Sequence, residues 1–127
     1  MIPKHPFTPQ TSQIPYKFGF NKDKIKAGEK VDITITGTFK GLLLEVREGD
    51  NAVGEWVVAD TDPDFRTLNC HGNNNTALTH KNAHYKSNVN LTWKAPNKVG
   101  KYILYATIGT TVESFWAHEA IKLINVV

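Results

Sequence analysis

Apolar and polar residues alternate with a period of two along most of this 127-residue chain. The clearest case is the run Val-Asp-Ile-Thr-Ile-Thr at 31–36, where aliphatic residues occupy every second position. Successive side chains of a β-strand point to opposite faces, so this spacing predicts strands with one face against a core. Helical spacing competes only at 113–123. We therefore expect an all-β chain with less than about a sixth of its residues in helices.

Turn-forming residues interrupt the alternation at short intervals, which predicts about seven to nine strands. Alternating or apolar segments lie at 16–20, 31–36, 42–47, 53–59, 89–93, 102–107, 115–116 and 121–127. Gly49-Asp50-Asn51 predicts a hairpin turn, and Cys70 to Thr76 predicts a loop. This pattern is typical of an antiparallel β-sandwich of the immunoglobulin-like type.

Composition and charge indicate an ordinary globular chain. Hydrophobic residues make up 40% and charged residues 21%, far from the low-hydrophobicity signature of disorder. Lysine and arginine number 15 against 12 acids, and the two signs are interspersed. We therefore expect a solvated basic surface with weak attraction to anionic polymers, and no nucleic-acid partner.

The first fifteen residues differ from the rest, because four of the six prolines lie there. Proline fixes φ and lacks the N–H used in a strand ladder, so 1–15 is predicted as an extended arm and 16–127 as the sandwich, together one domain. No apolar stretch approaches the roughly twenty residues of a membrane helix, so no membrane insertion is expected. The start also lacks the apolar core of a secretory signal, so any signal was removed or never existed.

Several segments resemble the reeler domain family, in its order and at about its spacing. They are Met1-Ile2-Pro3-Lys4-His5, Pro9-Gln10, Pro15-Tyr16, Phe39 to Arg47, Leu68-Asn69-Cys70, Thr79-His80, Trp93-Lys94-Ala95-Pro96 with Gly100, Tyr105-Ala106-Thr107 and Phe115-Trp116. The resemblance covers nearly the whole chain. The family occurs in reelin and the spondins, in ferric-chelate-reductase-like membrane proteins, and alone in secreted insect defence proteins.

The stand-alone length and the Met-x-Pro-x-His opening look most like the secreted defence branch. The resemblance implies a secreted, extracellular immune protein that binds microbial surface components or a host partner without catalysis or cofactor. The alternative is a matrix-type adhesion module that binds extracellular glycans or proteins, as the reelin and spondin relatives imply. The oligomeric state is left open by the sequence.

Cys70 is the only cysteine and has no partner within the chain. The family usually has a cysteine just before Met-x-Pro-x-His, so the resemblance implies that Cys70 is one half of a disulfide. Here that upstream cysteine is missing, and we expect an unpaired thiol in a chain that starts a few residues late. The segment 117–127 is longer than the resemblance implies, and no role is assigned to it.

A possible metal cluster comprises Cys70, His71, His80 and His84, which lie within fifteen positions. Thiolate and imidazole are ligands of zinc and copper. A blue-copper site also needs a weak axial ligand, often methionine, after a closely spaced Cys and His, and the only methionine is Met1. Since the resemblance assigns Cys70 to a disulfide, we expect surface histidines and no metal.

Two N-glycosylation sequons begin at Asn74 and Asn90. A glycan is the functional interpretation of each, and an ordinary polar surface residue is the alternative. Asn90 is expected to face outward on a strand whose Val89, Leu91 and Trp93 face the core.

Trp56 and Tyr85 are the candidates for a ligand surface, because aromatic rings can stack on sugars. For Trp56 a core position is the alternative. Asp60, Asp62 and Asp64 fall in a predicted turn, where short polar side chains bond to nearby backbone. They are therefore expected to be solvated rather than a catalytic pair, and the chain is not expected to be an enzyme.

Overall fold

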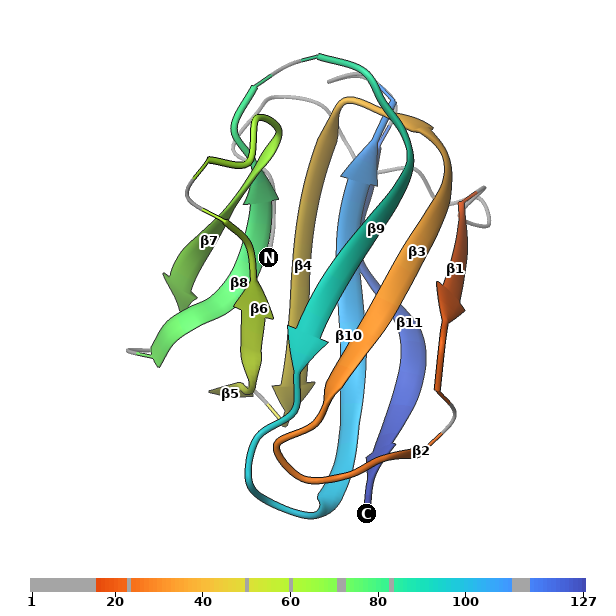
Figure 1. Ribbon diagram of the computed structural model, residues 1–127. Helices are drawn as coiled ribbons and strands as arrows, with labels where there is room; N and C mark the ends of the chain where they lie inside the picture. Colours follow the sequence, from red (N-terminus) through yellow and green to blue (C-terminus); the bar gives the residue numbers. More distant parts are fainter. Residues whose placement is uncertain are drawn as a thin grey trace.

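The chain folds into two β-sheets packed face to face (Figure 1). The computed structural model describes residues 16–22, 24–49, 51–59, 61–70, 73–82, 84–110 and 115–127, with the backbone alone for Asn69, Cys70, Asn73, Asn74, Phe115 and His118. The predicted arm at 1–15 lies outside the described residues. Within the described ranges there is no helix, and hence none that could span a membrane.

The first sheet, here sheet A, has the strand order β1-β3-β9-β6. Its strands are β1 (Lys17–Phe20), β3 (Lys30–Phe39), β9 (Lys86–Lys94) and β6 (Glu55–Val57). Sheet B has the order β2-β11-β10-β4-β8-β7, with β5 paired to β4. Its strands are β2 (Lys24–Ile25), β11 (Phe115–Val126), β10 (Gly100–Gly109), β4 (Gly41–Glu48), β5 (Asn51–Ala52), β8 (Asn73–His80) and β7 (Phe65–Cys70).

Nine of these eleven strands are paired only antiparallel, because β2 pairs parallel with the end of β11. The predicted all-β sandwich is confirmed. The described strands outnumber the seven to nine expected because no strand was expected at β2, β5, β7 or β8, and β2 and β5 have only two residues each. Short edge segments of this kind carry too few alternating residues to be recognised from a sequence.

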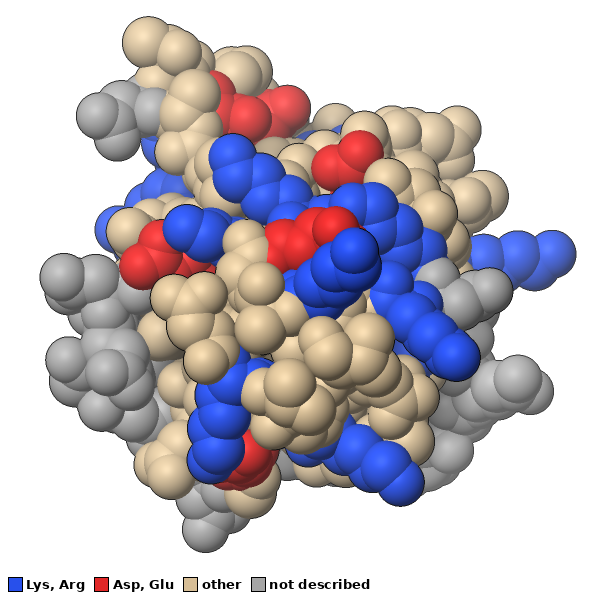
Figure 2. Space-filling view, turned by 60° about the horizontal axis from the view of Figure 1, so that its bottom comes forward, with Lys and Arg blue, Asp and Glu red and all other residues tan. Residues whose placement is uncertain are grey.

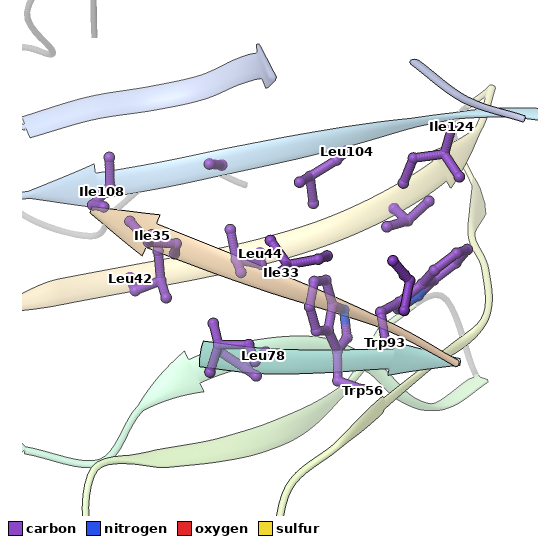
Figure 3. Close-up of a cluster of buried hydrophobic side chains, with 14 of the residues drawn as sticks. Ile33, Ile35, Leu42, Leu44, Trp56, Leu78, Trp93, Leu104, Ile108 and Ile124 are labelled. Carbon is purple, nitrogen blue, oxygen red and sulfur yellow. The ribbon is translucent and has the colours of Figure 1, made fainter. Parts of the chain in front are cut away.

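The core lies between the two sheets and is built from the alternating residues (Figure 3). Sheet A contributes Val31, Ile33, Ile35, Leu91, Trp93 and Trp56, and sheet B contributes Leu42, Leu44, Val46, Leu78, Tyr102, Leu104, Ala106, Ile108 and Ile124. The predicted register of β9 is confirmed, since Leu91 and Trp93 are buried, Val89 is partly buried against the core, and Asn88 and Asn90 are exposed. A slip of one residue would have exposed the whole set.

Tyr16 anchors the beginning of the described chain in this core. Its hydroxyl donates to the Thr38 carbonyl at 2.8 Å, and its ring meets Phe39 and Trp116 edge-on, with centroids 6.1 Å away in both cases. Gly37 lies against that ring with a φ of 125°, and a Cβ there would be 2.7 Å from Tyr16 Cδ1. Only glycine combines this backbone conformation with so close an approach.

The predicted loop at 70–76 is wrong for its second half. β7 and β8 form a hairpin in which Cys70 pairs with Asn73, and Thr76 is buried within β8. The register shifts between Leu68 and Cys70, and Asn75 in this irregular part has a φ of 57°. Asparagine tolerates such a left-handed conformation, so the asparagine-rich run forms a bulge inside a hairpin rather than an open loop.

Two further expectations need correction. The segment 113–123 is not helical where it is described, because β11 pairs along β10 from Gly109–Phe115 to Gly100–Val126. The strand expected at 53–59 is shorter and comprises Glu55–Val57 alone. The predicted hairpin turn at 49–51 is confirmed, since Glu48 pairs with Asn51 across Gly49, whose φ is 62°.

Candidate functional site

Tyr85 presents an exposed aromatic ring at the upper end of the sandwich in Figure 1, where the β3–β4 turn and the β8–β9 connection lie. The residue is 57% exposed. The Lys40 ammonium, from the β3–β4 turn, lies 4.7 Å from the centroid of this ring. A lysine over a tyrosine face is a favourable cation–π contact, and it places a positive charge beside an aromatic platform.

Lys86 fixes the segment that carries Tyr85. Its ammonium donates to the carbonyl oxygens of His84 at 2.7 Å, Lys40 at 3.1 Å and Asn82 at 3.1 Å, and to Asn82 Oδ1 at 3.1 Å. Lys86 is only 4% exposed, and this burial lowers the pKa of its ammonium, partly opposed by the charge of Asp64. These four hydrogen bonds, here called the Lys86 cage, tie the β8–β9 connection to the β3–β4 turn. They therefore hold the segments that carry Tyr85 and Lys40 together.

The sequence analysis did not predict a structural role for Lys86, because it treated the lysines together as a solvated basic surface. The strict alternation of β9 would place it on the outer face with Asn88 and Asn90. Asn88, however, has a φ of 51°, and the β3–β9 register shifts between Ile35 and Thr38. This bulge reverses the alternation, so the Lys86 stem turns toward the core.

Trp56 occupies the core position that the sequence analysis gave as the alternative to a ligand surface. It is 2% exposed, and it pairs with Trp93 across β6 and β9 on the inner face of sheet A (Figure 3). A three-residue strand beside a buried tryptophan has one inward position, and Trp56 occupies it. Of the two aromatic candidates, Tyr85 alone is exposed.

Of the predicted metal cluster, the structure describes the side chains of His80 and His84. His80 Nδ1 accepts a hydrogen bond from the Leu42 backbone N–H at 3.0 Å, and His84 is exposed. His71 and the Cys70 side chain lie outside the described residues, so the disulfide and metal expectations for Cys70 stay predictions. Among the described side chains, no three of the types His, Cys, Asp and Glu are placed to hold a metal ion.

The aspartates of the β6–β7 connection serve local structure. Asp62 Oδ1 accepts hydrogen bonds from the backbone N–H groups of Asp64 and Phe65, both at 2.9 Å. Asp64 Oδ1 in turn accepts from Asn82 Nδ2 at 3.2 Å. Asp60 lies outside the described residues. This bonding is the Asx-type turn that the sequence predicts.

The two sequons differ in what the structure describes. Asn90 is exposed on the outer face of sheet A and pairs with Thr34 of β3. Its position leaves room for a glycan above the sheet, and glycosylation stays a prediction. The Asn74 side chain lies outside the described residues.

An open groove of about 480 Å³ lies at the other end of the sandwich. Its lining includes Val53 and Gly54 before β6, Thr76 of β8, and the turn at 95–97. Glu55 and Lys94 pair across β6 and β9 and line the groove with opposite charges. Sequence reasoning missed this groove because its lining comes from three segments far apart in the chain.

Comparisons with known proteins agree on one family. The reeler domain family matches residues 1–127. The chain is 38% identical over 122 residues to "Putative defense protein 3" of Antheraea mylitta, a match that covers 91% of this chain and 73% of that protein. It is also 38% identical over 125 residues to "Putative defense protein Hdd11" of Hyphantria cunea, covering 91% and 75% of the two chains.

A solved structure has the same fold. The crystal structure of the human F-spondin reeler domain superposes with a TM-score of 0.72 at 19% sequence identity, over 95% of this chain and 94% of that one. The family match over the whole chain and the insect relatives show the family, and the solved structure shows the same fold. This chain belongs to the reeler domain family.

Proposed function

We propose that this protein is a non-catalytic, extracellular defence module that binds anionic polymers of microbial surfaces through Tyr85 and Lys40. The similarity to insect proteins named as defence proteins supports the defence role. The single observation that carries the binding site is the exposed Tyr85 ring with the Lys40 ammonium 4.7 Å from its centroid.

The chemistry of this pair suits a charged polysaccharide. A tyrosine ring offers an apolar face to the C–H groups of a sugar, and its hydroxyl stays available to water or ligand. The adjacent ammonium attracts phosphate or carboxylate groups on the same polymer. Because the Lys86 cage already holds this segment, little conformational entropy is lost on binding. The described carboxylates at 62 and 64 are engaged in turn structure, which supports a binding role over hydrolysis.

Sedimentation with insoluble bacterial cell walls tests the proposal. We expect Tyr85→Ala and Lys40→Gln each to weaken binding by about three- to tenfold, the range of a partly desolvated cation–π and stacking contact. Val57→Ala and Lys30→Gln are matched controls, since both residues are exposed on sheet A and Lys30 lies at the end of β3 opposite to Lys40. The controls should bind as the wild type does.

Two results would contradict the proposal. If the wild-type protein fails to sediment with cell walls, the proposed function is wrong. If both site variants bind as the wild type does, the proposed binding site is wrong. Binding to immobilised sulfated glycans without binding to cell walls would instead favour the adhesion alternative.

A further inference from the structure

Exposed aliphatic side chains gather on the outer face of β10 and β11. Five large hydrophobic residues are exposed in the described part of the chain, and three of them belong to this strand pair or adjoin it: Val99 at 65%, Leu123 at 50% and Val127 at 55%. Gly100 pairs with Val126, so Val99 and Val127 flank the same end of the two strands. Leu123 pairs with Ile103, three residue pairs further along the two strands than the Gly100–Val126 pair.

Positive side chains border these aliphatic residues. Lys24 of β2 and Lys101 of β10 both pair with Asn125 of β11, so the three form one row across the sheet. Residues in register share a face, and this row lies between the Val99–Val127 end and the Leu123–Ile103 pair. Both lysines are exposed, and no described carboxylate forms an ion pair with either.

A third cation lies on the other side of Ile103. Arg47 of β4 pairs with Ile103, donates to Glu45 Oε1 at 2.7 Å, and lies 5.6 Å from the Tyr105 ring centroid. Figure 2, which brings the lower end of the molecule forward, shows Lys and Arg side chains spread over that end with fewer acids between them. The nearby Glu48 is already paired with Lys98 at 3.2 Å.

We propose that this β10–β11 face, formed by Val99, Lys101, Ile103, Leu123 and Val127 with Lys24 beside them, docks on the surface of an anionic lipid bilayer. Exposed aliphatic residues that gather on one face, here on both sides of the lysine row, mark an interaction surface. Aliphatic residues flanked by lysines match an interface in which headgroups carry negative charge above an apolar layer. A second copy of the chain fits less well, because a two-fold contact would place the same positively charged face against itself.

The proposal gives a role to the long C-terminal segment 117–127, for which the sequence suggested none. β11 extends along the whole of β10 and supplies Leu123 and Asn125 to the face, and Val127 directly follows it. Docking is at the surface and needs no span. It is also separate from the Tyr85 site, which lies at the opposite end of the sandwich (Figure 1). Failure of one proposal therefore leaves the other standing.

Vesicle flotation with the full chain tests the proposal. The probes are vesicles of phosphatidylcholine alone and of phosphatidylcholine mixed with phosphatidylglycerol. We expect binding to the mixed vesicles only, and a decrease with added salt. Because each lysine near an anionic surface strengthens binding by about fivefold, Lys24→Gln with Lys101→Gln should weaken it by about twenty- to thirtyfold and flatten the salt dependence.

The apolar component is tested by Val99→Ser combined with Leu123→Ser. Loss of two partly inserted aliphatic side chains should weaken binding by at least about tenfold. Val57→Ser and Lys17→Gln, on sheet A, should bind as the wild type does. All the substituted side chains are exposed, so thermal melting of each variant should match the wild type and confirm that it is folded.

Four outcomes would overturn the proposal. The first three are equal flotation with both vesicle types, flotation unchanged in both double variants, and light scattering that shows a dimer abolished by Val99→Ser with Leu123→Ser. Loss of vesicle binding in Tyr85→Ala but not in the face variants would transfer any lipid contact to the opposite end, and so would also overturn it.

Discussion

Replacing Trp93 with alanine should remove the centre of sheet A's inner face. Trp93 is completely buried, and its register partners in the two neighbouring strands are Val31 and Trp56. Its indole N–H donates to the Val53 carbonyl at 3.4 Å. Gly54 approaches the ring so closely that a Cβ there would lie 2.5 Å from Trp93 Cζ2. The ring therefore supports both the core and the chain entering β6.

The expected cost is about 3–6 kcal/mol of unfolding free energy. Truncation of a buried tryptophan to alanine costs about 3–5 kcal/mol through lost burial and the remaining cavity. The long hydrogen bond to Val53 adds up to about 1 kcal/mol. At about 3–5 °C per kcal/mol for a chain of this size, the melting temperature should fall by about 9–30 °C.

Denaturant unfolding followed by far-UV circular dichroism measures this change. Asn90→Ala is the matched control, because Asn90 lies on the same strand with its side chain on the exposed face. It should change stability by less than about 0.5 kcal/mol. A loss below about 1.5 kcal/mol for Trp93→Ala, or an equal loss for the control, would show that the assignment of inner and outer faces in β9 is wrong.

Three further predictions follow from single positions. Lys86→Met keeps the apolar stem but leaves the caged backbone carbonyls without their donor, so denaturant melts should show a loss of about 2–4 kcal/mol. Gly54→Ala adds a Cβ against Trp93 at a φ of 72° and should cost more than about 2 kcal/mol by thermal melting; Gly49→Ala, at a φ of 62° with no atom within 4 Å, should cost only about 1 kcal/mol. Burial, assisted by the charge of Glu48, raises the pKa of the Tyr102 phenol above its ordinary value of 10.0. The folded state therefore holds that proton more tightly than the unfolded state, and its contribution to stability is present below about pH 10 and lost as pH rises through the raised pKa. Tyr102→Phe should show a smaller alkaline loss in unfolding titrations, and an identical pH profile would contradict this cause.

Most of the fold was predictable from alternation. In β3 from Val31 to Ile35 and in β9 from Val89 to Trp93, every second residue faces the core because a strand has a period of two, and that rule needs no knowledge of partners. The hairpin at Gly49 was predictable for a similar reason, since its turn chemistry is local. The resemblance to the reeler family was likewise visible in short segments along the chain, and the comparisons show the family directly.

Pairing with strands distant in the chain determined the elements that local sequence patterns did not predict. The segment 113–123 carries helical spacing, yet β10 offers a ladder along most of its length, and tertiary pairing outweighs a weak local preference. The asparagine run at 73–75 contains turn-formers, but β7 pairs with it and a positive φ at Asn75 absorbs the irregularity. Pairing energy comes from residues distant in the chain, and no local pattern reports it.

The candidate sites show the same division. From sequence alone, Tyr85 was an exposed aromatic candidate and Lys86 one lysine among many; the bulge at Asn88 turned Lys86 inward and so built the cage beneath Tyr85. The β10–β11 face exists only because register places Lys24, Lys101 and Leu123 on neighbouring strands. Alternation along one strand determines which side chains share a face, whereas the order and register of strands determine which faces meet, and those depend on the whole folded chain.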